Sequence, residues 1–398
     1  MSSSPLTWSV AIAFIASLLL FDFFFHVRKA HIPTLREATI WSSIYIGIAL
    51  LFGIAVLVLG GTQAGTEYFA GYVTEKALSI DNVFVFLVLM TSFKVPRQDQ
   101  QKVLLFGIVF SLIARTGFIF LGAALIHSFA WVFYIFGLIL LVTAGNLLKA
   151  EELNEERADN IVVRVARKLF HTTDYYDGDK LFTVHEGRRA LTPMLLVMVA
   201  IGGTDILFAL DSIPAIFGLT QDVFIVFTAT AFSLLGLRQL YFLIDGLLER
   251  LLYLSYGLAL ILGFIGVKLI LHALHENNLP FVNSGDPVPV IEISTGMSLA
   301  VILGVLLVTV VVSLRSPKGK TKTAVTALRR DVADYLDLDY PADATEREKI
   351  YARVVKSERK VMALEPGLRQ LIREPEKLKA ALARVHRQHT SGAGALQG

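Results

Sequence analysis

The chain has 398 residues, of which 54% are hydrophobic and 18% are charged, and its mean hydropathy is +0.60. Soluble domains carry about 25% charged residues, so this composition excludes an ordinary soluble protein. The sequence contains no cysteine, which excludes disulfide bonds, thiolate metal sites and dithiol redox chemistry. The net charge of +3 excludes little, but the positions of the charges are informative.

Apolar runs of about twenty residues recur along the chain, which is the length that a helix needs to cross a bilayer. They predict an all-α fold, a polytopic transmembrane helix bundle over residues 1–314. Nine spans are expected, at about residues 7–26, 40–60, 66–91, 102–126, 130–149, 191–217, 222–247, 252–275 and 293–314.

The basic residues favour one orientation of these spans. No Lys or Arg precedes the first span, whereas a cleavable signal peptide begins with a basic region. Lys and Arg occur in alternate loops, and the loops between them, such as GGTQAG and GLTQD, have none. Because the basic loops of membrane proteins face the cytoplasm, we expect the N-terminus outside and the C-terminus inside. Residues 150–190 would then form a long cytoplasmic loop.

The segment 315–398 differs from the spans, because it carries 18 Lys/Arg and 11 Asp/Glu, a net charge of +7. Thr345 and Glu348 have the spacing of a helix capping box ahead of an apolar run. We expect a basic cytosolic helical tail. The positive-inside rule alone explains a basic segment on the cytoplasmic side, without any binding role. The alternative is that the tail binds anionic lipid or a protein partner.

Two segments of the membrane domain, 66–149 and 191–275, resemble each other. EKALSIDNVF in the first matches TDILFALDSI in the second, and the span that follows each motif places an arginine near its middle, Arg115 and Arg238. In the expected topology the matching spans cross in opposite directions. The three-helix repeat is therefore predicted to be inverted, which is typical of secondary transporters whose site lies near the midplane.

Each repeat carries two acids six residues apart within an apolar span: Glu75 with Asp81, and Asp205 with Asp211. Six helical residues turn through about 600°, so two such side chains point about 120° apart on an intact helix. Either each acid faces a different neighbour, or the helix is broken between them, and Pro214 favours a break in the second repeat. A mid-bilayer charge costs about 2.5–3.5 kcal/mol on insertion scales and indicates a functional site.

A small polar residue follows the second acid of each pair. Carboxylate, amide and hydroxyl oxygens together make a hard ligand set, which suits Mg²⁺, Ca²⁺ or Mn²⁺, and a break would add free backbone carbonyls. The predicted metal ligands are Glu75, Asp81, Asn82, Asp205, Asp211 and Ser212.

Two other uses of these acids stay open. They could relay protons, or they could only neutralise Lys76, Arg115 and Arg238 in buried ion pairs that hold the bundle together. A further acid, Asp22, lies near the inner end of the first span, where it is expected to reach the membrane interface.

Three stretches resemble the TerC/Alx family of integral membrane proteins: GYVTEKALSIDNVF at 71–84, DILFALDSIPA at 205–215 and GFIGVK at 263–268. The resemblance covers about residues 5 to 315 and does not extend to the tail. This family is similar to the LysE-type transporters, which have inverted three-helix repeats. The resemblance implies Mn²⁺ export, an association with tellurite resistance and an acidic site at the four carboxylates. Manganese, export and tellurite come from the resemblance and not from the residues.

These observations lead us to expect a divalent-cation exporter, for Mn²⁺, in a bacterial inner membrane. Its two repeats would rock about a midplane carboxylate site. Protons are the expected counter-ion, because crowded carboxylates in a low dielectric take up protons when no cation is bound. We expect no enzymatic activity, no resident cofactor and no nucleic-acid partner.

Two other functions are alternatives to transport. The first is a membrane scaffold for a tellurite or metal stress-resistance complex, with the tail as its dock. The second is an intramembrane aspartyl protease, in which two carboxyls share a proton. The Gly-x-Gly-Asp stretch expected of such proteases is absent, and Gly202-Gly203-Thr204-Asp205 resembles it only loosely.

Overall fold

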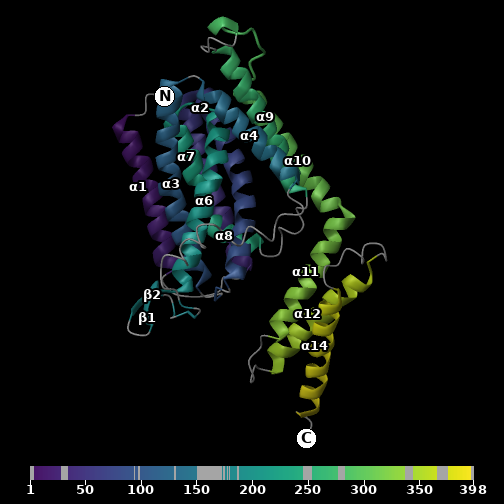
Figure 1. Ribbon diagram of the computed structural model, residues 1–398. Coiled ribbons are helices and arrows are strands. Elements are labelled where there is room, and N and C mark those ends of the chain that lie inside the picture. Colours follow the sequence, from purple (N-terminus) through teal and green to yellow (C-terminus); the bar gives the residue numbers. More distant parts are fainter. Residues whose placement is uncertain are drawn as a thin grey trace. The chain divides into compact units, whose positions relative to one another are not determined.

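The computed structural model divides the chain into two compact units, which are described separately (Figure 1). The membrane unit comprises Met1–Leu243 and Leu254–Val308, and the tail unit comprises Ile244–Tyr253 and Thr309–Gly398. The structure describes residues 4–27, 35–93, 95–96, 99–129, 131–149, 173, 175–176, 178, 180–185, 188–244, 253–276, 283–336, 344–364 and 375–395.

Helices make up nearly all of the described part of the membrane unit. They are α1 (Pro5–Asp22) with the π-helical turn η1 (Phe23–Val27), α2 (Leu35–Ser92), α3 (Gln100–Ser128), α4 (Val132–Lys149), α6 (Pro193–Phe217), α7 (Val223–Leu234), α8 (Leu237–Ile244), α9 (Leu254–His275), the 3₁₀ turn η4 (Asn283–Gly285) and α10 (Thr295–Arg315), which continues into the tail unit. Within the described residues, seven helices are long and apolar enough to cross a membrane. The prediction of an all-α polytopic membrane protein is therefore confirmed.

The helix α2 is much longer than a single membrane crossing requires. Its 58 residues would extend about 85 Å, whereas a hydrocarbon core is about 30 Å thick. Gly61, with φ of 85° and ψ of 174°, interrupts the helical backbone and divides α2 into two arms. The arms correspond to the spans expected at 40–60 and 66–91.

The span expected at 222–247 is also divided, between α7 and α8. Gly236 at this break has a φ of 79°, and a Cβ added there would lie 2.8 Å from Cβ of Tyr45. Only glycine fits, both because of its positive φ and because of the close approach. Asp222 caps the start of α7, where its carboxylate accepts from the backbone N–H of Phe224 at 3.0 Å.

The helix α6 is continuous from Pro193 to Phe217, with Pro214 inside its last turns. In α2 the interruption is at Gly61, and the EKALSIDN stretch is helical. The possibility of a break between the paired acids, with free carbonyls as ligands, is therefore wrong. A proline near a helix end leaves most of the backbone hydrogen bonds in place, so it does not have to break the helix.

A short β-hairpin lies within the loop expected at 150–190, and the sequence analysis did not predict it. Strand β1 (Phe182–His185) pairs antiparallel with β2 (Arg188–Leu191), with Phe182 opposite Leu191. The hydroxyl of Thr192 donates to the carbonyl of Lys180 at 2.7 Å and closes the hairpin just before α6 begins. The hairpin lies at the end of the bundle opposite the N-terminus (Figure 1).

The principal helix contacts join the first expected repeat to the second. Helix α2 packs against α7, α3 against α6, and α4 against α9. The last pair approaches closely, because a Cβ added to Gly137 of α4 would lie 2.9 Å from the carbonyl oxygen of Gly266 in α9. Small residues at such a crossing allow tight packing in a membrane, where the hydrophobic effect does not drive association.

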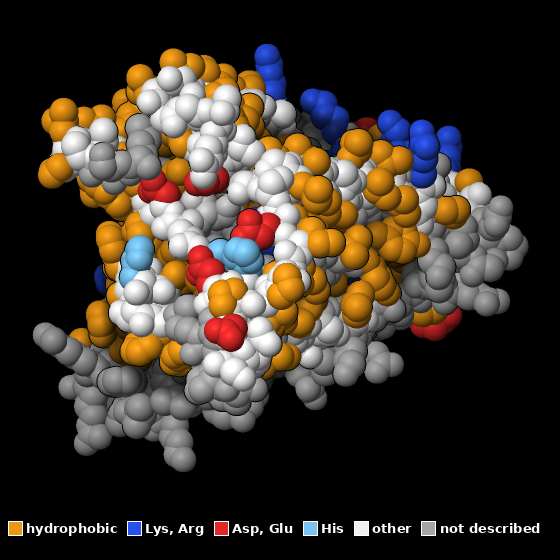
Figure 2. Space-filling model, turned by 90° about the horizontal axis from the view of Figure 1, so that it is seen from above, with side chains coloured by type: hydrophobic (Ala, Val, Ile, Leu, Met, Phe, Trp, Pro, Cys, Tyr) orange, Lys and Arg blue, Asp and Glu red, His pale blue; other side chains and the backbone are white. Residues whose placement is uncertain are grey.

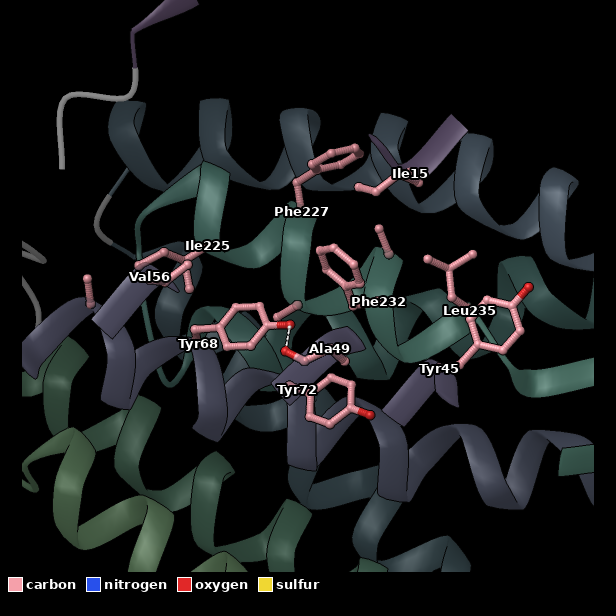
Figure 3. Packing of buried hydrophobic residues seen from close by; sticks show 13 residues of the cluster. Ile15, Tyr45, Ala49, Val56, Tyr68, Tyr72, Ile225, Phe227, Phe232 and Leu235 are labelled. Atoms are coloured by element: carbon pink, nitrogen blue, oxygen red, sulfur yellow. Dashed lines mark hydrogen bonds between the residues drawn. The ribbon is translucent and has the colours of Figure 1, made fainter. Parts of the chain in front are cut away.

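Aromatic and aliphatic side chains form a buried cluster, with Ile15 from α1 and most of the rest from α2 and α7 (Figure 3). Phe52 of α2 and Phe232 of α7 have ring centroids 4.5 Å apart. The buried hydroxyl of Tyr68 donates to the carbonyl of Ala49 at 3.0 Å, so the second arm of α2 is bonded to the first. This cluster helps to hold the second arm of α2, which carries the first pair of acids.

The tail unit has a hydrophobic core of its own. Its helices after α10 are α11 (Pro317–Leu336), α12 (Ala344–Met362) and α14 (Pro375–Ala395). The buried side chains between them are Val325, Leu328, Val332, Tyr335, Ile350, Val354, Val361, Leu378, Leu382 and Val385.

Candidate functional site

The guanidinium of Arg115 is the centre of the candidate site. Arg115 lies near the middle of α3, its side chain is fully buried at 0% exposure, and it is one of the largest fully buried side chains among the described residues. Moving a charge out of water into an apolar bundle is unfavourable unless the charge is paired and hydrogen-bonded. The partners of Arg115 therefore indicate how the bundle accommodates it.

Two of the predicted acids neutralise this guanidinium. Glu75, from the second arm of α2, forms an ion pair with Nη1 of Arg115. Asp205 of α6 accepts from Nη2 with its Oδ1 at 3.4 Å, and Ser212 of α6 accepts from Nη1 with its Oγ at 3.0 Å. All four side chains are buried, so one ionic cluster connects α2, α3 and α6 inside the membrane unit.

Asn82 completes the surroundings of Arg115. With its amide oriented so that both groups are satisfied, its oxygen accepts from Nη2 of Arg115 at 3.2 Å and its nitrogen donates to the carbonyl of Leu78 at 3.2 Å. Four of the six predicted metal ligands, Glu75, Asn82, Asp205 and Ser212, thus surround one protein cation.

The fifth predicted ligand, Asp211, faces a neighbouring pocket. This pocket has a volume of about 150 Å³ and is lined by Leu78, Asn82, Thr143, Asn146, Leu147, Phe208, Asp211, Leu258 and Leu262. Thr143 and Asn146 of α4 are polar lining residues that the sequence analysis missed, although a polar pair three residues apart in an apolar span was a usable signal. The side chain of the sixth predicted ligand, Asp81, lies outside the described residues.

The cluster around Arg115 retains unused acceptor capacity. Oε2 of Glu75 and Oδ2 of Asp205 are buried and accept no hydrogen bond from any described residue. The hydroxyl of Ser79, one helical turn after Glu75, is likewise buried without a hydrogen-bond partner among them. Buried acceptors are almost always satisfied in proteins, so water, a ligand or a second arrangement of the site would supply the partners of these oxygens.

The described members of the predicted metal cage do not come together around one point. Within the described parts of the chain, no three acidic or histidine side chains lie close enough together to hold a metal ion. Glu75 and Asp205 contact a guanidinium instead, and Asp211 lines a separate pocket. The paired acids on α6 therefore face different neighbours, and metal binding stays a prediction.

The second buried arginine, Arg238 of α8, has other partners. It donates from Nη2 to Oδ1 of Asp22 and from Nη1 to Oε1 of Gln101, both at 2.6 Å. Oδ1 of Asp22 also accepts from Gln239 at 3.0 Å and from the hydroxyl of Tyr45 at 3.1 Å. The expectation that Asp22 reaches the interface is wrong: it is buried at 5% exposure because Arg238 requires a counter-charge there.

The remaining predicted cation, Lys76, contacts a backbone oxygen. Its Nζ donates to the carbonyl of Ser233 at 3.0 Å, across the contact between α2 and α7. Buried ion pairs with the paired acids were one predicted role for these cations. Arg115 does pair with two of those acids, Arg238 pairs with Asp22 instead, and this contact of Lys76 is with a backbone carbonyl.

A wider pocket of about 540 Å³ opens at the end of the bundle where the N-terminus lies. Its polar lining includes Glu67, Thr220, Lys268, His272 and Glu292. In Figure 2, which is seen from this end, acidic and histidine side chains surround a hollow. Glu67 accepts from the hydroxyl of Thr220 at 2.5 Å, which joins α2 to the segment after α6.

Comparisons with known proteins agree with the resemblance. The model of the family described as integral membrane protein TerC family matches residues 60–321. An uncharacterized membrane protein of Mycobacterium tuberculosis is 55% identical over 390 residues, which are 97% of this chain and 98% of that protein. Alx of Escherichia coli (strain K12), named as a candidate membrane-bound redox modulator, is 36% identical over 319 residues, which are 78% of this chain and 94% of Alx. No solved structure matches the chain.

Proposed function

This chain belongs to the TerC family of integral membrane proteins, and from that premise we propose that it transports a divalent metal cation across the membrane. One observation carries the proposal: Glu75, Asp205 and Arg115 form a fully buried ionic cluster that connects three apolar helices. Ionisable groups at such depth are unfavourable and mark ion pathways in membrane proteins. The unused carboxylate oxygens in this cluster are hard ligands, which suit Mn²⁺, Mg²⁺ or Ca²⁺.

The proposed architecture has nine crossings and two inverted repeats. The two arms of α2 and the short apolar helix α4 (Val132–Leu148) would bring the seven long helices to nine crossings. The contacts of α2 with α7 and of α3 with α6 exchange under a two-fold relation between the repeats, and the contact of α4 with α9 maps onto itself. Rocking of one repeat against the other would expose the cluster alternately to each side.

The cation, direction and counter-ion are narrower proposals. Mn²⁺ and export come from the TerC resemblance, as does the bacterial inner membrane. With the N-terminus outside, the wide pocket beside Glu67 and His272 would be the outer vestibule. Protons are the proposed counter-ion, so collapse of the pH gradient by an ionophore should slow export.

Tellurite resistance and redox effects are proposed to be indirect. A cluster of carboxylates repels an oxyanion, so tellurite is not the proposed ligand. The relative Alx is named for redox modulation, but this sequence has no cysteine to perform thiol chemistry. A change in the cytoplasmic concentration of a redox-active metal would connect transport to both effects. We do not propose an aspartyl protease, because Asp205 contacts Arg115 whereas Asp211 lines a separate pocket, and the two do not form an aspartyl dyad.

The tail unit gives one reason to retain the scaffold function as a second candidate. It has its own core, and 55% identity to the mycobacterial relative extends over 97% of the chain. As a scaffold, the protein would bind a protein partner or anionic lipid through this basic unit. Deletion of residues 316–398 separates the two functions, because a transporter should retain metal flux and a scaffold should lose its effect on metal resistance.

The test of the transport function is Mn²⁺ flux in proteoliposomes. Wild type should move Mn²⁺, whereas Asp81→Asn and Asp211→Asn should fold and lose flux. Glu376→Gln is the matched control, because Glu376 is an exposed carboxylate of the tail and its loss should leave flux unchanged. A wild-type protein that moves neither Mn²⁺ nor Mg²⁺ nor Ca²⁺ would refute transport and leave the scaffold.

A further inference from the structure

Arg115 stands where the proposed substrate cation would be expected. Its guanidinium contacts Glu75, Asp205 and Ser212, and with the amide orientation given above also Asn82. The sequence predicts these four residues as oxygen ligands for a divalent cation. The same oxygens therefore bind a cation that belongs to the protein.

Charge repulsion makes simultaneous occupancy unfavourable. A divalent ion bound to Glu75 and Asp205 would lie within a few ångströms of the guanidinium, in an interior where like charges are poorly screened. The two carboxylates each have one oxygen on Arg115 and one buried oxygen without a hydrogen-bond partner among the described residues. A divalent cation can therefore bind both carboxylates only if Arg115 loses at least one of its contacts with Glu75 and Asp205.

A pocket that contains a further carboxylate lies beside the cluster around Arg115. Asn82 contacts Nη2 of Arg115 and also lines the 150 Å³ pocket that contains Asp211. A shift past Asn82 would bring the guanidinium toward another carboxylate without taking it into lipid. The contact with Asp205, at 3.4 Å, is also longer than the 2.6 Å bonds that fix Arg238.

We propose that Arg115 is a tethered counter-cation of the transport site. It neutralises Glu75 and Asp205 when no substrate is bound, and it withdraws from at least one of them when a divalent cation binds. The inference rests on the proposed transport function and adds how the site is regulated. This competition would help the protein to release the substrate cation. Transport requires binding that is weak enough to reverse, and a competing internal cation weakens the binding of the substrate.

Arg238 supplies the matched comparison. In the sequence it is the counterpart of Arg115 in the second expected repeat. It is buried at 3% exposure, and its partners Asp22 and Gln101 are not predicted ligands. A substitution at Arg238 disturbs a buried arginine network to a similar degree, but it does not alter competition at the site.

The test is a Mn²⁺ titration of the purified full-length protein in detergent at one fixed, mildly alkaline pH. Free Mn²⁺ is followed by its electron paramagnetic resonance signal. Arg115→Gln should bind Mn²⁺ at least about tenfold more tightly than wild type. Removing one nearby positive charge changes the affinity of a site for a cation by about that factor. Arg115→Lys keeps the charge but loses the forked donor geometry, so it should bind about threefold more tightly. Arg238→Lys should bind like wild type.

The outcomes separate the two proposals. If wild type binds Mn²⁺ while both Arg115 variants bind equally or more weakly, Arg115 is a fixed structural partner and only the counter-cation role is overturned. If wild type and Arg115→Gln both fail to bind Mn²⁺, Mg²⁺ and Ca²⁺, the transport function itself is overturned. Should Arg115→Gln not fold, as judged by its thermal unfolding, Arg115→Lys decides the question in the same titration.

Discussion

Asp22 accepts a hydrogen bond of 2.6 Å from Arg238, although 216 residues separate them in the chain. This bond joins α1 to α8 inside the membrane unit, and both side chains are nearly inaccessible. Arg115, the other buried arginine of the membrane unit's described spans, is neutralised by Glu75 and Asp205 instead. The two arginines are thus paired with acids from different helices.

The first prediction concerns this bond. Asp22→Asn should lower the free energy of unfolding by about 3–5 kcal/mol, because it leaves a buried arginine without a counter-charge. The thermal unfolding of the purified protein in detergent measures the loss. The double variant Asp22→Asn with Arg238→Met should recover part of it, because no unpaired charge then remains. An unchanged unfolding temperature for Asp22→Asn would mean that another group neutralises Arg238.

The second prediction separates the roles of the acids on α6 and α2. Glu75→Gln should abolish Mn²⁺ flux and also lower stability by about 3–5 kcal/mol, because it leaves Arg115 underpaired. Asp211→Asn should abolish flux with a smaller loss of stability, because it leaves the contacts of Arg115 with Glu75 and Asp205 in place. Flux and thermal unfolding are measured on the same preparations. Equal losses of stability in the two variants would contradict this division.

The third prediction concerns the break between α7 and α8. Gly236→Ala should destabilise the protein by at least about 1–2 kcal/mol, because an L-residue is strained at positive φ and its Cβ meets Tyr45. Gly304→Ala is the control, since a Cβ added at Gly304 of α10 has no neighbour within 4 Å. Alanine should be neutral or slightly stabilising there. Unfolding temperatures of the two variants should therefore move in opposite directions or differ clearly in size.

The fourth prediction concerns a tyrosine outside the spans. Burial and the nearby Asp99 raise the pKa of Tyr176 to about 12, and its hydroxyl donates to the carbonyl of Phe93 at 2.7 Å. The folded-state pKa is above the ordinary value of 10, so the stabilisation is complete below pH 10 and is lost as the pH rises toward 12. The phenolate absorbance of wild type minus that of Tyr176→Phe should titrate near the higher value. A difference spectrum that titrates near pH 10 would show that the hydroxyl is not held at Phe93.

Local patterns in the sequence are enough to show that this is a polytopic helical membrane protein and which of its acids lie in apolar spans. Hydropathy and span length are sums over neighbouring residues, so the chain carries them without any tertiary information. The motifs around Glu75 and Asp211 likewise identified the TerC family from sequence order alone.

Which charged side chains contact each other depends on how the helices pack. Glu75 and Asp205 reach Arg115, Asp211 faces a separate pocket, and Asp22 is drawn inside by Arg238. These contacts depend on how helices pack across sequence separations of 90 and 216 residues. An acid in a span shows that some partner is needed, because a bare charge in an apolar interior is unstable. The identity of that partner is a property of the packing, which no local pattern contains.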